Sequence, residues 1–225
     1  MKFSANDFEL IKEITIDAGQ IIKDTKNKRF SLKQDKSPVT LADLKSNKLI
    51  CKRLKENFPY IPIISEELKK KIVSDTFFLV DPLDGTKEFL KDRDDFTVNI
   101  AFIENKIPRY GFIFAPNLEE LYWNNDEFSF LKKKKRVSKI SVKDNFKKIY
   151  FEVSNSHLDI NTYNFINTFE SKIIKKTGSS LKICNLAKGK SNLYPRFLGS
   201  MEWDIAAGHS ILKKAGGNIF TLNNN

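Results

Sequence analysis

Cysteine and histidine are scarce in this chain, whose 225 residues include 2 Cys and 2 His. Cys51 and Cys184 stand far apart in the sequence and form no Cys-x-x-Cys pair. A structural zinc site needs about four closely spaced Cys or His ligands, so the composition excludes one. Two isolated cysteines are typical of a protein from a reducing compartment.

Long apolar runs are also missing. The longest are stretches such as Phe77–Val80, whereas a membrane-spanning helix needs about 20 apolar residues. The residues after Met1 contain no apolar core of a signal peptide. We therefore expect a cytoplasmic protein with no integral membrane segment; peripheral association with the inner face of the membrane is the alternative.

Glycine and proline are few, at 9 and 7 residues, which excludes a collagen-like or low-complexity chain. Hydrophobic residues make up 40% of the chain and include 19 Phe, enough for a sizeable core. The charged residues are unbalanced: 39 Lys and Arg against 28 Asp and Glu give a net charge of +11.

Arginine is a small part of that positive charge, with residues only at positions 29, 53, 93, 109, 136 and 196. Arginine makes the bidentate contacts that read nucleic-acid bases, so we expect no nucleic-acid partner. A basic surface attracts polyanions in general, and phosphorylated metabolites are among them. A solvated coat of lysines is the alternative interpretation.

The apolar pattern predicts two helices and then a series of strands in the first part of the chain. Ser4 and Asp7 resemble a capping box for a helix that ends near Lys23, and residues 26–36 are predicted to be a loop. Thr40 can cap a second helix that ends at Pro59. Short apolar runs then predict strands at 61–64, 77–80, 96–103, 110–115, 121–123 and 128–131.

The basic run Lys132–Arg136 is the predicted boundary between an N-terminal α+β subdomain, residues 1–131, and a C-terminal α/β subdomain, residues 132–225. We interpret the run itself as a solvated linker. Beyond it the pattern predicts strands at 149–153, 173–177 and 192–194, and helices at 160–169, 180–188 and 203–215.

The segment Leu79–Thr86 is the most informative in the sequence. An apolar strand ends at Asp81, Pro82 bends the chain, and Asp84 follows before a Gly-Thr turn. Two carboxylates at the end of a buried strand repel each other unless a cation lies between them. Oxygen ligands favour a hard divalent cation, Mg²⁺ foremost. A turn with solvated carboxylates is the alternative.

Three further carboxylates can join this pair. Glu66 follows another apolar strand, Asp43 lies three residues after Thr40, and Asp204 opens the last predicted helix. Each has a structural alternative, because Asp43 and Asp204 can simply cap their helices.

Four motifs in order resemble the inositol monophosphatase superfamily: Ser37–Asp43 (S-P-V-T-L-A-D), Ser65–Glu67 (S-E-E), Leu79–Phe89 (L-V-D-P-L-D-G-T-K-E-F) and Trp203–His209 (W-D-I-A-A-G-H). Within it the chain is most similar to the CysQ-type 3′(2′),5′-bisphosphate nucleotidases, on the segments Thr86–Phe89, Gly178–Lys182 and Tyr194–Phe197. The resemblance implies a layered α-β-α-β-α sandwich.

The resemblance also implies the roles of the site residues. Glu66, Asp81 and the carbonyl of Leu83 would hold a first Mg²⁺, and Asp81, Asp84 and Asp204 a second. Glu66 would contribute to a third, looser ion. Asp43 and Thr86 would orient and deprotonate the attacking water, and the N–H groups of Gly85 and Thr86 would face the phosphate.

Four residues of the C-terminal part match positions that contact the nucleotide in that branch: Ser154, His157, Gly178 and Lys182. Lys182 can pair with the phosphate that is not cleaved. His157 can bind ribose or phosphate, and its alternative is a histidine in a surface loop. Arg196 can contact a phosphate or form a surface salt bridge.

The leading hypothesis is a Mg²⁺-dependent, Li⁺-inhibited enzyme that hydrolyses the 3′-phosphate of adenosine 3′,5′-bisphosphate, with the related phosphosulfate as a second substrate. It would act as a monomer or homodimer and clear a by-product of sulfate assimilation. The first alternative is an inositol-phosphate or sugar-phosphate phosphatase of the same superfamily. The remote one is a non-catalytic polyanion-binding protein.

Overall fold

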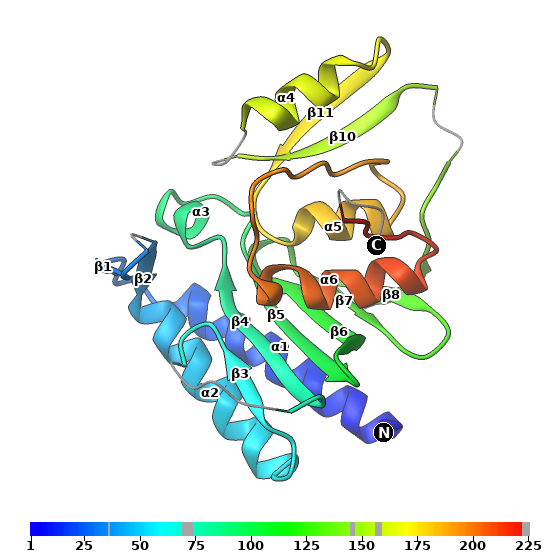
Figure 1. The fold of residues 1–225 in the computed structure, drawn as a ribbon. Helices are drawn as coiled ribbons and strands as arrows, with labels where there is room; N and C mark the ends of the chain where they lie inside the picture. Colours follow the sequence, from blue (N-terminus) through cyan, green and yellow to red (C-terminus); the bar gives the residue numbers. More distant parts are fainter. Residues whose placement is uncertain (36, 69–73, 145–146, 156–158, 222–225) are drawn as a thin grey trace.

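A mixed sheet of seven strands lies at the centre of the computed structural model, which describes residues 1–35, 37–68, 74–144, 147–155 and 159–221 (Figure 1). Its strands follow one another across the sheet in chain order: β3 (Ile63–Ser65), β4 (Phe77–Asp84), β5 (Thr97–Glu104), β6 (Ile107–Ala115), β7 (Glu120–Asn124), β8 (Ser129–Lys133) and β9 (Arg136–Ile140). β3 and β4 are parallel, and the other neighbours are antiparallel.

Two long helices cover one face of this sheet, as the sequence predicts. α1 (Ala5–Asp24) begins with the expected capping box of Ser4 and Asp7, and α2 (Leu41–Asn57) begins with one made by Thr40 and Asp43. Their apolar sides pack against the sheet in a core rich in aromatic rings, in which Phe3, Phe78 and Phe102 lie close together. These two helices and their core fix the strands that carry the site.

The opposite face of the sheet is covered by α5 (Leu181–Ala187) and α6 (Glu202–Lys214), which share a second core with it. Beyond these helices lie the parallel strands β10 (Ile149–Ser154) and β11 (Lys172–Thr177), and α4 (Ile160–Asn167) forms the outermost layer (Figure 1). The layers therefore alternate helix, sheet, helix, sheet, helix. This confirms the predicted α-β-α-β-α sandwich.

Several local predictions were wrong. The predicted loop at residues 26–36 contains β1 (Phe30–Leu32), which pairs with β2 (Pro38–Thr40) in a hairpin. The short helix α3 (Thr86–Leu90) was missed. Residues 192–194 form no strand and contribute one bridge, between Leu193 and Phe151. Phe30 and Leu32 are exposed, so burial left no periodic signal from which β1 could be predicted.

The basic run Lys132–Arg136 is the turn of a hairpin and does not form a linker. Lys132 and Lys133 lie in β8, Arg136 begins β9, and the two strands pair directly. The predicted boundary between residues 131 and 132 thus falls inside a strand of the central sheet. The division into residues 1–131 and 132–225 stays a prediction.

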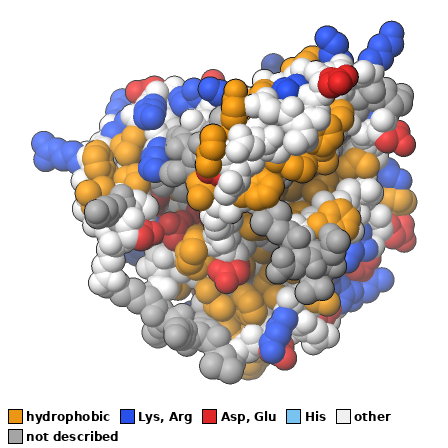
Figure 2. Space-filling model, turned by 45° about the horizontal axis from the view of Figure 1, so that its top comes forward, with side chains coloured by type: hydrophobic (Ala, Val, Ile, Leu, Met, Phe, Trp, Pro, Cys, Tyr) orange, Lys and Arg blue, Asp and Glu red, His pale blue; other side chains and the backbone are white. Residues whose placement is uncertain are grey.

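The described Lys and Arg side chains are scattered over the face shown in Figure 2 and form no single large patch there. On the face shown in Figure 2, Lys and Arg side chains lie mostly around the periphery, and hydrophobic side chains lie nearer the middle. Within the ranges that the structure describes, no helix combines the length and the apolar character that crossing a membrane requires.

Candidate functional site

The candidate site lies where β4 ends, and a β-bulge decides its shape. Asp81 pairs with Asn99 of β5, but Asp84 pairs with Thr97, so β4 has one extra residue between these pairs. Residues three apart in a regular strand point to opposite faces. The bulge removes that alternation and brings both carboxylates to one side.

Pro82 and Gly85 shape the chain around these carboxylates. Pro82 has no N–H to donate and lies in the bulge, where such a residue is tolerated, and its carbonyl accepts a bond of 2.7 Å from Ser46 Oγ of α2. Gly85 has φ of +89°, a conformation that favours glycine. It turns the chain into α3 directly after Asp84.

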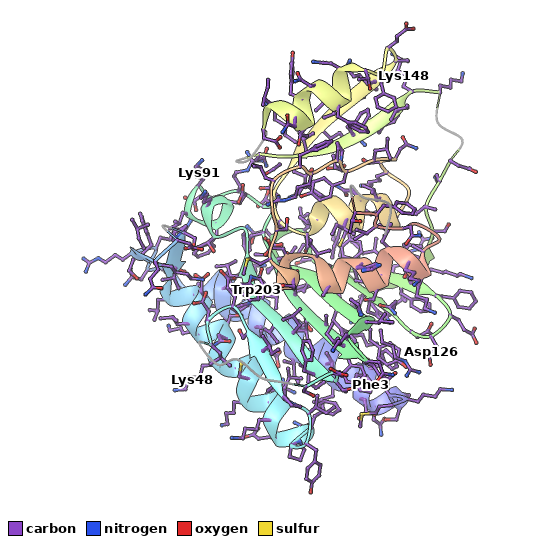
Figure 3. The ribbon with its side chains drawn as sticks, viewed as in Figure 1. Phe3, Lys48, Lys91, Asp126, Lys148 and Trp203 are labelled. Carbon is purple, nitrogen blue, oxygen red and sulfur yellow. The ribbon has the colours of Figure 1, made fainter. Side chains whose placement is uncertain are left out.

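Three carboxylates come together at this point. One oxygen each of Asp81, Asp84 and Asp204 lies within 4.8 Å of the others, and these residues form a possible metal-binding group. Asp204 comes from the first turn of α6, next to Trp203, which is labelled in Figure 3. It accepts the Met201 N–H at 3.2 Å with one oxygen. It therefore caps its helix and joins the group as well.

The electrostatics of the three carboxylates favour a bound cation. Burial, together with the negative charges of Glu66, Asp84 and Asp204, raises the pKa of Asp81 well above its ordinary value. Burial and Asp204 raise the pKa of Asp84 to about 7. Burial also raises the pKa of Asp204. Because like charges are held together away from water, ionising all three requires a compensating positive charge.

The donor set fits a hard divalent cation. The three side chains of the group each offer a carboxylate oxygen, which is the ligand that Mg²⁺ prefers. The carbonyl oxygen of Leu83, the residue before Asp84, lies 3.2 Å from Thr86 Oγ1.

Glu66 lies outside this group of three but close to it. Its backbone N–H donates to Val80 O at 3.1 Å, which ties the end of β3 to β4. Its Oε1 accepts 2.6 Å from Lys33 Nζ, which also donates to Glu67 at 2.7 Å. Burial alone would lower the pKa of Lys33, but the hydrogen bonds to Glu66 and Glu67 raise it above its ordinary value. The β1–β2 hairpin therefore supplies a positive charge to this edge, which the sequence did not indicate.

Asp43 and Thr86, the pair to which the resemblance assigns the attacking water, are hydrogen-bonded to each other. Thr86 Oγ1 donates to Asp43 Oδ1 at 3.1 Å, and the second oxygen of Asp43 accepts from the backbone and hydroxyl of Thr40 at 2.8 and 2.5 Å. Asp43 thus combines its helix cap with a hydroxyl partner from the β4 turn. Burial raises the pKa of Asp43, which makes its carboxylate a better proton acceptor.

The segment Gly178–Lys182 reaches the same carboxylates from the other side. The N–H of Ser180 donates to Asp84 Oδ2 at 2.6 Å. Lys182 is buried, donates to Ser179 O at 2.6 Å and lies over the ring of Tyr194. Burial lowers the pKa of Lys182, and the charge of Asp84 opposes that change.

The remaining predicted substrate residues are only partly placed. Ser154 ends β10, on the layer beyond α5. His157 lies outside the described residues. Arg196 donates to the carbonyls of Leu198 and Gly199 and to the hydroxyl of Tyr194, so it organises its own loop.

Sequence reasoning missed several polar residues around the site. Asn99 of β5 donates to Asp84 at 3.2 Å and accepts from Ser180 Oγ at 2.8 Å. Asp95 accepts the N–H of Gly178 at 2.6 Å. The contacts of Asn99 with Ser180 and of Asp95 with Gly178 join residues more than 80 positions apart, and the contact of Asn99 with Asp84 joins neighbouring strands. No local spacing therefore indicates them.

Comparison with known proteins identifies the family. The sequence matches the inositol monophosphatase family over residues 7–225. The chain belongs to that family. It is 40% identical over 202 residues to the 3′(2′),5′-bisphosphate nucleotidase CysQ of Buchnera aphidicola, with 85% of this chain and 74% of the relative covered. The CysQ of Salmonella typhimurium is 36% identical over 204 residues, with 89% of this chain and 82% of the relative covered.

A solved structure supports the same relationship within the inositol monophosphatase family. The crystal structure of CysQ from Bacteroides thetaiotaomicron, a bacterial member of that family, superposes with a TM-score of 0.82 at 33% identity and covers 95% of this chain and 88% of the other. The family assignment that the sequence motifs predicted is therefore confirmed.

Proposed function

We propose that this protein is a Mg²⁺-dependent phosphatase that hydrolyses the 3′-phosphate of adenosine 3′,5′-bisphosphate to give AMP and phosphate. The observation that carries the proposal is the convergence of Asp81, Asp84 and Asp204 beside the Asp43–Thr86 pair. The choice of substrate is supported by the curated relatives, whose names state this nucleotidase activity.

The metal-binding roles are those that the resemblance to the inositol monophosphatase superfamily implies, and the group of Asp81, Asp84 and Asp204 supports them. Asp81, with Glu66 and the carbonyl of Leu83, would hold one Mg²⁺, and Asp81, Asp84 and Asp204 would hold a second. Glu66 would also contribute to a third, looser ion. Bound Mg²⁺ acidifies a coordinated water and neutralises charge on a transferring phosphoryl group. Inhibition by Li⁺ is part of the proposal.

Thr86 and Asp43 would move the proton of the attacking water. The hydroxyl of Thr86 lies 3.1 Å from Asp43 Oδ1 and 3.2 Å from the carbonyl oxygen of Leu83. When it donates to Asp43, its oxygen can accept a hydrogen bond from the attacking water. As it accepts that proton, its own proton passes to Asp43. Thr40 holds the other oxygen of Asp43 in place, which keeps the proton acceptor oriented throughout.

The remaining contacts would bind the substrate. The N–H groups of Gly85 and Thr86 would face the phosphate that is cleaved. Lys182 would pair with the phosphate that is retained, and Ser154, His157 and Gly178 would contact the nucleoside. A buried lysine held by Ser179 O and Tyr194 is fixed in position, so little side-chain freedom is lost when it binds an anion.

The deciding experiment measures phosphate release from adenosine 3′,5′-bisphosphate and from inositol 1-phosphate, with Mg²⁺, with EDTA and with added Li⁺. We expect a higher kcat/KM for the bisphosphate, no turnover in EDTA and inhibition by Li⁺. A preference for inositol 1-phosphate would replace the nucleotidase by an inositol phosphatase. Turnover that persists in EDTA would exclude the metal-dependent mechanism.

A further inference from the structure

Asp95, in the segment between α3 and β5, accepts hydrogen bonds from segments far apart in the sequence. Its Oδ2 accepts the backbone N–H of Gly178 at 2.6 Å and Asn155 Nδ2 at 2.6 Å. Arg93 donates to both oxygens, from Nε at 2.8 Å and from Nη2 at 3.0 Å. One carboxylate thus joins the end of β10 and the β11–α5 turn to the chain that leads into β5.

The backbone of Asp95 is in equally close contact with its neighbours. A Cβ added at Gly178 would lie 2.5 Å from the carbonyl oxygen of Asp95, and one at Gly85 would lie 3.3 Å from the same atom. Glycine is therefore required at position 178 for the turn to approach so closely. The turn that follows Asp84 and the turn that precedes α5 both pack on this residue.

A second carboxylate holds the same turn from the other end. Ser180 donates its N–H to Asp84 Oδ2 at 2.6 Å, and its hydroxyl lies 2.9 Å from Thr97 Oγ1. The turn Gly178–Ser180 is therefore held between Asp84 at the candidate metal site and Asp95. Lys182 follows in the first turn of α5, so its position depends on both contacts.

Asp95 is a strong and fixed hydrogen-bond acceptor. Its side chain is 14% exposed. Burial alone would raise the pKa of Asp95, but the hydrogen bonds from Arg93 and Gly178 lower it below its ordinary value. The carboxylate is therefore ionised at neutral pH. Hydrogen bonds to an ionised carboxylate are about twice as strong as those between neutral groups.

We propose that Asp95 is a positioning residue that sets the selectivity of the site for nucleotide bisphosphates over small phosphate monoesters. The inference rests on the proposed function. In the proposed binding mode, a nucleotide bisphosphate would span from the carboxylates at the end of β4 to the Gly178–Lys182 segment, whereas a small monoester would contact mainly the carboxylate side. Displacing the segment therefore weakens the binding of the spanning substrate alone.

The test compares Asp95→Asn with Asp94→Asn, which makes the same charge change in the neighbouring residue. Asp94 is exposed and bonds to Asn117, away from the turn. For Asp95→Asn we expect KM for adenosine 3′,5′-bisphosphate to rise about tenfold, kcat to stay within about twofold, and KM for p-nitrophenyl phosphate to stay unchanged. Asp94→Asn should match the wild type on both substrates.

Asn155→Ala provides a second variant that removes one partner of Asp95 and leaves the carboxylate in place. It should raise the same KM by about threefold. Calorimetry of the product gives a readout independent of turnover: Asp95→Asn should bind AMP about tenfold more weakly, and inorganic phosphate as tightly as the wild type does.

The outcomes separate this inference from the proposed function. An equal loss on both substrates, or no change on either, in Asp95→Asn overturns the positioning role while the nucleotidase activity of the wild type stands. If Asp95→Asn does not fold, an unchanged KM and AMP affinity in Asn155→Ala overturns it. A wild type that releases no phosphate from the bisphosphate refutes the proposed function itself.

Discussion

The two sides of the site are held in place by different forces. The carboxylates at the end of β4 are held by strands and helices that pack into two large hydrophobic cores. The outer layer of β10, β11 and α4 has a small core built on Phe151, Val153 and Ile166. Its approach to the carboxylates depends on polar contacts at Asp84 and Asp95.

This difference suggests that the carboxylate side serves catalysis and the outer segments serve substrate binding. Hydrophobic burial gives the carboxylates a rigid frame, which positioning for catalysis requires. On the substrate side, hydrogen bonds between segments add to the packing of α5 in holding the Gly178–Lys182 segment, so these polar contacts can be changed with less effect on the fold. Variants on the two sides should therefore have effects of different kinds, on kcat at the carboxylates and on KM at the outer segments.

The largest effect is expected from Asp81→Asn. The substitution removes the carboxylate that both proposed metal positions share, so phosphate release should fall by at least about 10³-fold. The metal-free variant should remain folded and melt at a higher temperature than the wild type at neutral pH, because burial and neighbouring carboxylates raise the pKa of Asp81 and the amide does not have to take up a proton on folding. Phosphate release and thermal unfolding in EDTA measure the two effects.

The control for Asp81→Asn is Asp75→Asn, an exposed carboxylate just before β4 that pairs with Lys106. It should leave both turnover and melting temperature within the error of the wild type. Retention of more than about a tenth of the activity by Asp81→Asn would contradict the proposed role of the bridging carboxylate.

A smaller effect, confined to the substrate side, is expected from Lys182→Met. Methionine keeps most of the buried volume of the side chain but removes the charge, so KM for the bisphosphate should rise about tenfold to a hundredfold. KM for p-nitrophenyl phosphate should change by less than about threefold. The exposed Lys176→Met on β11 is the matched control. A fall in kcat with unchanged KM would show that Lys182 acts on the chemistry.

The smallest effect concerns stability as a function of pH. The pKa of Asp84 rises from 3.8 to about 7 in the folded protein. The folded state therefore holds a proton that the unfolded state releases, and this contribution to stability is complete below pH 4 and is lost as the pH rises through 7. In EDTA the melting temperature should fall over that range, and Mg²⁺ should reduce the fall.

Asp84→Asn provides the control for this pH dependence. The amide cannot ionise, so the fall in melting temperature between pH 4 and 7 in EDTA should shrink by about 3 °C or more. An identical pH profile in the variant and the wild type would show that Asp84 is not held protonated.

Much of the site was predictable because its residues lie at the ends of clear elements. Leu79–Val80 reads as a buried strand, and the carboxylates follow it within a few residues. The spacing of Thr40 and Asp43 predicts the capping box that they form at the start of α2. In both places a local pattern is sufficient, because the neighbours in space are also neighbours in sequence.

The rest of the site depends on contacts that no local pattern records. Lys33 reaches Glu66 from an exposed hairpin, and Asp95 binds a backbone N–H 83 positions further along the chain. The hairpin around Lys132–Arg136 was missed because a run of lysines resembles a linker. These residues have only a weak local preference for a strand, and pairing with β7 and β8 places them in strands nevertheless.

The sequence by itself determined which groups are available for chemistry: a set of carboxylates, a threonine and a lysine in an ordered series of motifs. The tertiary structure decided that these groups act together. Asp81 and Asp84 face the same side only because a bulge interrupts the alternation of β4. Asp204 and Ser180 join them only because α5 and α6 pack on the opposite face of the same sheet. Side-chain identity is local, but the direction in which each side chain points depends on pairing and packing across the whole fold.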